Sequence, residues 1–191
     1  MNEIKYLSKI TNHFEDAAQV IISSKNLAIE IQKAAIAIVE AIRLGNKVMW
    51  CGNGGSAADS QHLAAELVGR YKIARPGISS IALTTDSSVM TAIANDFGYD
   101  HIFERQVSAI GKPGDILVCL TTSGKSTNIL KALDQARLSH IKTILISSTQ
   151  AHSTEADIKI LVDSQKVEQI QHAHITIGHI ICEIIESELF G

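Results

Sequence analysis

Residues 47–57, KVMWCGNGGSA, contain a short apolar run, a glycine-rich loop and the beginning of a helical pattern. A short apolar run followed by a turn signal is typical of a buried strand. Glycines let the loop backbone approach an anion, and the helix that follows has free N–H groups at its start. Because ligands of open α/β sheets bind at the carboxyl ends of the strands, we expect a binding site at this loop.

The same order of strand, loop and helix repeats along the chain. We predict strands at 47–51, 79–84, 115–120, 141–147 and 158–162, and helices at 3–24, 26–44, 57–71, 87–95, 102–110, 127–138 and 165–189. This alternation predicts a parallel sheet with right-handed crossovers, whose strands are buried on both faces. We therefore predict one domain over 1–191, with N-terminal helices in 3–44, an α/β core in 46–163 and a C-terminal helix in 165–189.

Charge and cysteine content exclude several classes of protein. The 191 residues include 17 basic and 20 acidic side chains, a formal net charge of −3. A basic nucleic-acid-binding face needs clustered Lys and Arg, so we expect no nucleic-acid partner. No signal peptide is visible, and no apolar run approaches the roughly 18 residues of a membrane-spanning helix. Cys51, Cys119 and Cys182 show no disulfide or zinc-ribbon spacing, so we predict a cytoplasmic protein with reduced cysteines and no membrane contact.

The apolar residues are mainly aliphatic, since 46% of the chain is hydrophobic but only 4% is aromatic. The predicted helix at 26–44 is apolar on nearly all sides. A helix of this kind is buried on most of its surface, and in so small a domain a subunit interface would explain the burial.

The first loop allows two other interpretations. Gly52, Gly54 and Ala57 fit the relaxed dinucleotide fingerprint, but the acidic residue expected about 20 residues later is missing, and Asp86 comes too late. The chain also has no second domain that would hold a hydride acceptor. Ser56 is a suitable helix N-cap, which is the purely structural alternative.

The second loop, Thr121-Thr122-Ser123-Gly124-Lys125-Ser126, follows the predicted strand at 115–120 and precedes a helix. Hydroxyls and backbone N–H groups at a helix start favour binding of a phosphate monoester. The end of this loop has a Walker-like Gly-Lys-Ser, but the first required glycine is replaced by Cys119, which argues against a nucleoside triphosphate site. Ordinary capping and a tight turn are the structural alternative.

Two segments carry residue types that bind metals. His62 and Glu66 are spaced by four and share one face of their predicted helix. The last predicted helix contains Gln171, His172, His174 and His179 within an apolar stretch. From periodicity alone, His172 and His179 are the better pair for one ion, because they share a stripe of the helix. A buried core histidine is the plain interpretation of His174.

Four segments resemble the sugar isomerase (SIS) domain family and, more narrowly, the phosphoheptose isomerases. They are CGNGGSAADSQHLAAELVGRY at 51–71, IALTTDSSVMTAIANDFGYDHIFERQV at 81–107, GDILVCLTTSGKSTNILKAL at 114–133 and VEQIQHAHITIGHIICEIIE at 167–186. The resemblance covers about residues 5–189. It implies a flavodoxin-like three-layer α/β sandwich, in which helices flank a five-stranded parallel sheet and further helices precede it.

The resemblance also implies an activity and an assembly. Such enzymes interconvert D-sedoheptulose 7-phosphate and D-glycero-D-manno-heptose 7-phosphate through an ene-diol, at the start of ADP- or GDP-heptose synthesis for lipopolysaccharide or capsule. They form homotetramers with active sites at the subunit interfaces. Two alternatives stay open: a non-catalytic relative that associates with the replication initiator, and an isomerase of another phosphosugar. The resemblance to that non-catalytic branch is weaker at two positions, because the branch lacks the counterparts of Glu66 and His179, which this chain has.

By motif, the resemblance assigns roles to individual residues. Because aldose–ketose isomerisation needs a base at carbon and an acid at oxygen, our hypothesis is that Glu66 is the catalytic base and His179 the acid. The resemblance implies one Zn²⁺ per subunit on His62, Glu66, Gln171 and His179, so it selects Gln171 where periodicity prefers His172. The implied substrate contacts are Asn53, Gly54, Gly55, Glu66, Asn95, Asp96, Gln171 and, around the phosphate, Thr121, Thr122, Ser123 and Ser126.

Overall fold

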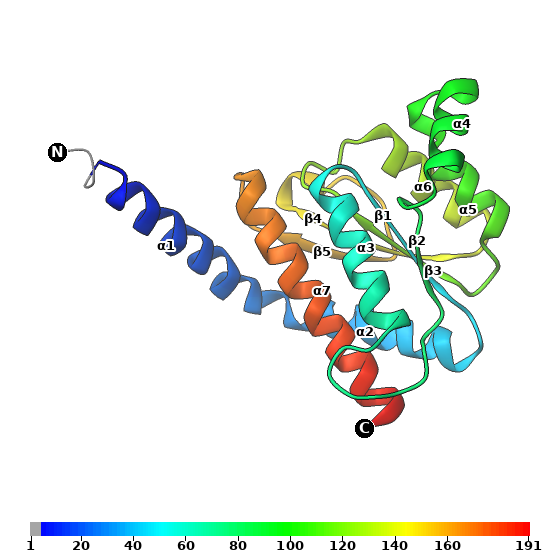
Figure 1. The fold of residues 1–191 in the computed structure, drawn as a ribbon, viewed down its shortest axis with the longest axis horizontal. Coiled ribbons are helices and arrows are strands. Elements are labelled where there is room, and N and C mark those ends of the chain that lie inside the picture. Colours follow the sequence, from blue (N-terminus) through cyan, green and yellow to red (C-terminus); the bar gives the residue numbers. More distant parts are fainter. Residues whose placement is uncertain (1–4) are drawn as a thin grey trace.

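A computed structural model describes residues 5–191 and shows one five-stranded parallel sheet with the strand order β2-β1-β3-β4-β5 (Figure 1). The strands are β1 (Val48–Gly52), β2 (Ser80–Ala82), β3 (Ile116–Leu120), β4 (Lys142–Ser148) and β5 (Ile158–Val162). β1 and β3 are buried at every residue. This burial agrees with their uninterrupted apolar sequences, since strands covered on both faces need no polar alternation. The predicted five-stranded parallel fold is confirmed.

Seven α-helices are described: α1 (Leu7–Ser23), α2 (Ala28–Arg43), α3 (Gly55–Val68), α4 (Ser87–Phe97), α5 (Glu104–Ile110), α6 (Thr127–Leu138) and α7 (Val167–Phe190). Three short 3₁₀ turns, η1 (Ser24–Leu27), η2 (Tyr99–His101) and η3 (Thr149–Ala151), connect some of them. Alternate strand residues point to opposite faces of the sheet. One face packs against α2, α3 and α7, and the other packs against α5 and α6, which gives the predicted three layers.

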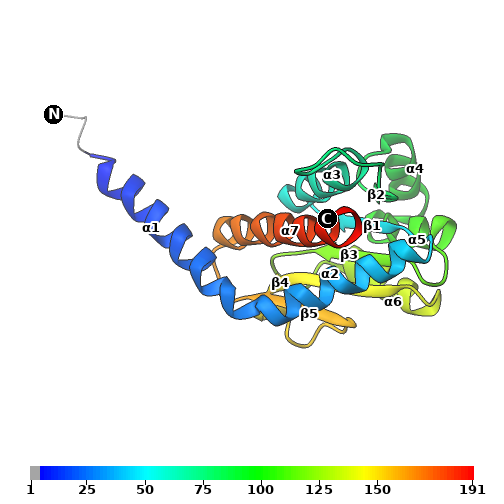
Figure 2. The ribbon, with the colours of Figure 1, turned by 90° about the horizontal axis from the view of Figure 1, so that it is seen from below.

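None of the 17 residues of α1 is buried, which α1 shares only with the shorter α4 among the described α-helices. Figures 1 and 2 both show α1 extending away from the body of the molecule, with the N-terminal end far from the sheet. Its side that faces α7 carries the ion pair between Asp16 and Lys166, at 2.5 Å. Among residues 5–191, no helix is both long and apolar enough to span a bilayer.

The explanation offered for the apolar helix at 26–44 is wrong. The buried residues of α2, including Ile31, Ala35 and Ile38, belong to one core with α7 and the sheet of the same chain. No second subunit is needed to cover them. Exposed apolar side chains occur on several elements, including α2, where Ile29 is 64% exposed. Those of α1 include Ile10, at 52% exposure, and Phe14, at 72%.

Several predicted boundaries move for physical reasons. The helix predicted at 57–71 begins at Gly55 and ends at Val68. It ends early because Arg75 occupies the carbonyls that a further helical turn would need as acceptors. Arg75 Nη2 and Nη1 donate to the carbonyls of Glu66 and Leu67, at 2.7 and 2.6 Å. The strand predicted at 79–84 is only three residues long. The predicted start of the first helix at residue 3 lies outside the described residues.

Candidate functional site

The strand order reverses between β1 and β3, because β2 lies on one side of β1 while β4 and β5 follow β3 on the other. Such a reversal leaves a crevice at the carboxyl ends of the two strands, where ligands of this architecture bind. Asn53 and Gly54 follow β1 at this edge, and the 121–126 loop follows β3. The two loops predicted to hold the substrate therefore lie side by side.

A pair of amides joins the two loops. Asn53 Nδ2 donates to Asn128 Oδ1 and Asn128 Nδ2 donates to Asn53 Oδ1, both at 2.9 Å. The Tyr99 hydroxyl donates to the same Asn53 Oδ1 at 3.1 Å. Sequence reasoning missed Asn128 and Tyr99. Asn128 is a polar residue in the first turn of the helix after a hydroxyl-rich loop, and this position could have indicated a role at the site. Nothing in the sequence indicated such a role for Tyr99.

The 121–126 loop is braced from β4 and from the segment after it, where the Thr154 hydroxyl donates to the Gly124 carbonyl at 3.1 Å. The hydroxyls of Ser147 and Ser148 donate to the carbonyls of Thr121 and Thr122, at 2.6 and 2.7 Å. The backbone N–H of Gly124 donates to Thr121 Oγ1 at 3.3 Å, and Gly124 has a φ of +66°. A fixed loop with inward N–H and O–H groups suits binding of an anion.

Ser126 occupies the N-cap position of α6, but its side chain makes no capping hydrogen bond within the described chain. Of the structural alternative for this loop, the side-chain cap is therefore not formed at Ser126, whereas the tight turn is present at Gly124. The hydroxyl of Ser126 is available to a ligand. Ser123 Oγ accepts from the Lys125 backbone N–H at 3.2 Å, so this hydroxyl keeps its proton for another acceptor. Both side chains fit the predicted phosphate contacts.

The first turn of α3 also lacks the expected side-chain cap. Its N-cap is Gly54, with a φ of +58°, and not Ser56, which is buried at 3% exposure. The capping interpretation of Ser56 is thus wrong as well. Gly55 lies directly against Gln171 of α7, since a Cβ on Gly55 would come 3.0 Å from Gln171 Cδ. The starts of α3 and α7 therefore meet at this point, through the amide end of the Gln171 side chain.

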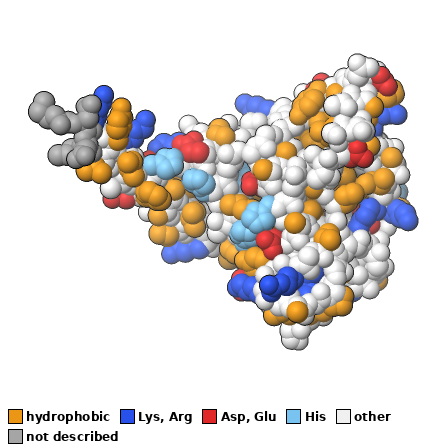
Figure 3. All heavy atoms as spheres, viewed as in Figure 1, with side chains coloured by type: hydrophobic (Ala, Val, Ile, Leu, Met, Phe, Trp, Pro, Cys, Tyr) orange, Lys and Arg blue, Asp and Glu red, His pale blue; other side chains and the backbone are white. Residues whose placement is uncertain are grey.

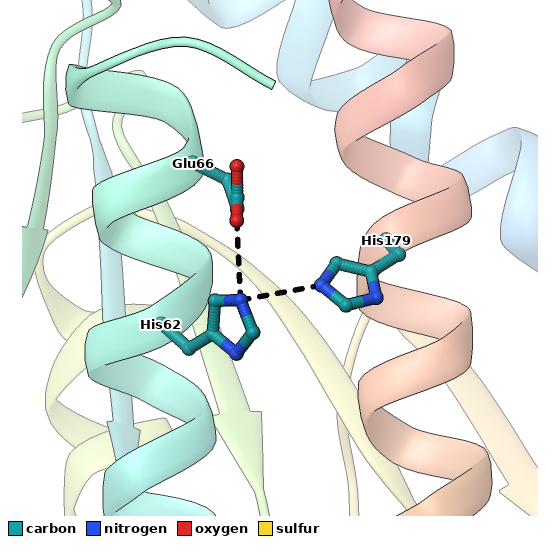
Figure 4. A group of neighbouring side chains, drawn as sticks. All are labelled: His62, Glu66 and His179. Atoms are coloured by element: carbon teal, nitrogen blue, oxygen red, sulfur yellow. Dashed lines mark hydrogen bonds and ion pairs between the residues drawn. The ribbon is translucent and has the colours of Figure 1, made fainter. Parts of the chain in front are cut away.

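Further along α3, His62 and Glu66 face His179 of α7 (Figure 4). His62 Nε2 lies 3.1 Å from Glu66 Oε1 and 3.4 Å from His179 Nε2. The side chains of His62 and Glu66 are 48% and 22% exposed. In Figure 3, histidine side chains with an adjacent carboxylate lie together on this surface of the molecule. The cluster is therefore accessible to a ligand from solvent.

Close packing of α3 and α7 brings the cluster together. Gly178, next to His179, lies against Leu63, next to His62, and a Cβ on Gly178 would come 3.0 Å from Leu63 Cγ. The ring of Tyr71 stacks on His179 with a centroid distance of 5.6 Å and an interplanar angle of 22°. Small residues at such a contact let two helices approach, and stacking restrains the imidazole.

The residues of the cluster fit a divalent metal ion. One ligand atom from each of His62, Glu66 and His179 lies within 4.8 Å of the others. Two imidazoles and one carboxylate are a ligand set that zinc accepts, with a further position left for another ligand. Gln171, the fourth predicted ligand, packs on Gly55 at the start of α3, about 12 Å along the helix axis from His179.

The other histidines of α7 lie elsewhere. His172 is exposed and makes an edge contact with His13 of α1, with ring centroids 6.2 Å apart. The pairing of His172 with His179 that periodicity favours is therefore not formed. His174 is fully buried, and burial lowers its pKa to about 4. This agrees with its interpretation as a core residue.

The predicted contacts Asn95 and Asp96 lie exposed near the end of α4, where Asn95 Nδ2 donates to Asp96 Oδ1 at 2.8 Å. The short turn after α4 carries Tyr99, which reaches Asn53. This segment therefore borders the first loop. Asp59, one turn before His62 on α3, has a pKa raised by burial.

Comparison with known proteins gives consistent matches. Residues 10–148 match the SIS domain family. The chain is 48% identical over 189 residues to phosphoheptose isomerase 2 of Campylobacter jejuni, covering 96% of this chain and 94% of that protein. It is 46% identical over 168 residues to a phosphoheptose isomerase of Akkermansia muciniphila, covering 87% and 89%. A phosphoheptose isomerase structure from Francisella tularensis superposes with a TM-score of 0.90 at 36% identity, covering 95% of this chain and 98% of that chain.

Proposed function

The chain belongs to the SIS domain family, and we propose that it acts there as a phosphoheptose isomerase that converts D-sedoheptulose 7-phosphate to D-glycero-D-manno-heptose 7-phosphate. The observation that carries this proposal is the accessible cluster of His62, Glu66 and His179 between α3 and α7. Aldose–ketose isomerisation needs a base at carbon and an acid at oxygen, and a carboxylate beside an imidazole supplies both.

In the proposed reaction, the carbonyl group moves from C2 of the ketose to C1 of the aldose. Glu66 accepts a proton from C1 and returns it to C2. His179 donates a proton to the carbonyl oxygen as the ene-diol forms and takes the proton of the neighbouring hydroxyl as it collapses. The number of protons and electrons on the sugar is unchanged overall. The hydrogen bond between His62 Nε2 and Glu66 Oε1, at 3.1 Å, restrains the carboxylate in the cluster.

A bound zinc ion would polarise the substrate oxygens and stabilise negative charge on them. We propose that His62, Glu66, Gln171 and His179 hold it, and that Glu66 shifts its coordination when it acts as the base. The chain's own residues orient the sugar. The braced loop at 121–126 binds the phosphate away from the reacting carbons and so fixes their position relative to Glu66.

We further propose that the protein works as a homotetramer with active sites at its subunit interfaces. The exposed apolar side of α1 supports this proposal, since Ile10 and Phe14 find no cover within the described chain. As the family resemblance suggests, the product would enter ADP- or GDP-heptose synthesis for lipopolysaccharide or capsule in the cytoplasm.

The test is incubation of the full chain with sedoheptulose 7-phosphate, after chelation and with or without added zinc, with the aldose product followed by NMR. We expect conversion that chelation reduces and zinc restores. Glu66→Gln should lower kcat by roughly 10²–10⁴-fold, the usual contribution of a general base. Glu188→Gln, at an exposed glutamate of α7, is the matched control and should retain activity.

Conversion by Glu66→Gln at the wild-type rate would exclude Glu66 as the base. Full activity after exhaustive chelation would remove the metal from the mechanism. If the wild-type chain converts no phosphoketose at all, the isomerase proposal falls, and the non-catalytic, initiator-associating alternative takes its place.

A further inference from the structure

The side-chain amide of Asn53 has almost all of its hydrogen-bonding capacity used by the protein. Its Oδ1 accepts from Asn128 Nδ2 at 2.9 Å and from the Tyr99 hydroxyl at 3.1 Å. Its Nδ2 donates to Asn128 Oδ1 at 2.9 Å. An amide oxygen has two lone pairs and an amide nitrogen has two protons. The one function left open on Asn53 is therefore a single N–H.

The two partners hold this orientation in different ways. Asn128 is only 2% exposed and lies in the first turn of α6, so its amide is fixed by the helix and its surroundings. Tyr99 is 56% exposed and approaches from η2, directly after Gly98, whose φ of +93° turns the chain toward β1. The three side chains come from three different segments and meet at the crevice between β1 and β3.

We propose that Tyr99 and Asn128 are positioning residues that fix the Asn53 amide so that its free N–H binds an oxygen of the sugar phosphate. This inference rests on the proposed function, because it deepens the description of the same site. The ligand group it selects is an acceptor, a hydroxyl or carbonyl oxygen of the sugar. The phosphate has its own donors in the loop at 121–126.

The orientation has a direct chemical test. Asn53→Asp keeps acceptor oxygens for Asn128 Nδ2 and the Tyr99 hydroxyl, but it removes both N–H groups of Asn53: the free one and the one that donates to Asn128 Oδ1. If the N–H faces the sugar, Asn53→Asp should bind sedoheptulose 7-phosphate no better than Asn53→Ala. If the amide oxygen faced the sugar instead, Asn53→Asp would bind better than Asn53→Ala, and the proposed orientation would be overturned.

The positioning role is tested with a double-mutant cycle, because two residues that act through one contact are not additive. Tyr99→Phe removes one donor to Asn53 and should lower kcat/KM by roughly 3–10-fold, the range for one neutral hydrogen bond, mainly through KM. In an Asn53→Ala background, the same change should have less than a twofold effect. Tyr6→Phe is the matched control, since Tyr6 is 57% exposed and precedes the first residue of α1, the helix that extends away from the sheet (Figure 1).

Equal losses from Tyr99→Phe in both backgrounds would mean that Tyr99 contacts the substrate itself, which overturns the inference. No loss in the wild-type background would overturn it as well. If the wild-type chain binds sedoheptulose 7-phosphate without converting it, the proposed function fails but the same cycle is read from dissociation constants by calorimetry. If the chain neither binds nor converts this sugar phosphate, both proposals fall.

Discussion

At the scale of single residues, a buried carboxylate holds the loop beside the candidate site. Glu186 of α7 is 2% exposed, and it accepts from Arg75 Nε and from the backbone N–H groups of Tyr71, Lys72 and Ile73. Burial alone would raise the pKa of Glu186, but these donors together lower it. The loop carries Tyr71, whose ring stacks on His179, so Glu186 supports the cluster without touching it.

Glu186→Gln should destabilise the protein by about 3–5 kcal/mol, because removing one partner leaves the Arg75 charge buried and unpaired. The free energy of unfolding from urea denaturation measures this. Glu188→Gln, two residues later, removes an exposed carboxylate that lies 3.7 Å from Arg43, and it should cost about 0–1 kcal/mol. Equal costs for the two variants would show that the buried pair does not support the fold.

The buried histidine predicts a pH dependence of stability. The pKa of His174 is lowered to about 4 in the folded protein, mainly by burial, while the unfolded chain protonates near pH 6.5. Between these values the unfolded state binds more protons, so stability falls as the pH decreases from 6.5 to 4. The loss from this one group should total about 3 kcal/mol.

Denaturation of the metal-free protein at pH 7, 5.5 and 4 checks this prediction. His174→Asn should lower stability at pH 7 but flatten the dependence on pH. His152→Asn, at an exposed histidine, is the control and should keep the wild-type slope. A slope in His174→Asn as steep as that of the wild type would assign the acid sensitivity to other groups.

Contacts between single residues can be predicted from the sequence when both residues lie on one helix, but not when they depend on how separate elements pack. The spacing of His62 and Glu66 predicts one shared helix face, and the structure has their side chains together. The partnership with His179 came from the family resemblance, because it depends on how α3 and α7 pack. Tyr99 and Tyr71 escaped prediction, since their contacts are set by loops whose path no local pattern fixes.

At the scale of elements, the distance between α3 and α7 is set by the contact of Gly178 with Leu63. Gly178→Ala would stabilise an isolated helix by about 1 kcal/mol. Here the added Cβ would lie 3.0 Å from Leu63 Cγ, and Leu63 is fully buried and has no room to move. We therefore expect a net loss of about 1–3 kcal/mol from overpacking.

The same variant should weaken zinc binding by roughly tenfold, because the helices that carry His62 and His179 would move apart. Competition with a chromogenic chelator measures the affinity without relying on activity. Ser187→Ala places an alanine at an exposed position of α7 and should change neither property. Leu63→Val combined with Gly178→Ala should restore part of the stability and part of the zinc affinity. If it restores neither, the contact of Gly178 with Leu63 does not set the distance between the two helices.

The positions of helices and strands could be predicted from the sequence wherever a local pattern alone determines them. The apolar runs of β1, β3 and β4 and the helix starts after each loop follow from the sequence. The start of α3 did not, because Gly54 and not Ser56 forms its N-cap. The early end of α3 also depends on Arg75, which reaches back from a later loop to its last carbonyls.

At the scale of the whole molecule, α1 has two different sides. His13 and Asp16 face α7, whereas the side with Leu7, Ile10 and Phe14 is open to solvent. These apolar residues recur at helical spacing and so form one stripe. The sequence showed the aliphatic excess and led us to expect a subunit interface at the helix at 26–44. It did not predict the exposed stripe on α1, since periodicity does not tell which helix the rest of the chain covers.

We expect Ile10→Asp combined with Phe14→Asp to reduce the assembly from tetramers to smaller species, as measured by sedimentation equilibrium. The reason is that two charges would be buried at an apolar contact between subunits. Asn12→Asp lies on the opposite side of α1 and should leave the assembly unchanged. A wild-type chain that sediments as a monomer would refute the proposed homotetramer.

The position of α7 has a consequence for how the protein is made. α7 is the last helix of the chain, yet it packs against α1, α2 and α3, which are the first three. During synthesis these early helices leave the ribosome without the surface that covers them. Such long-range closure slows folding and leaves apolar surface open to aggregation in the meantime. A chain cut before residue 167 would therefore fail to reach the native state, although every strand of its sheet would be present.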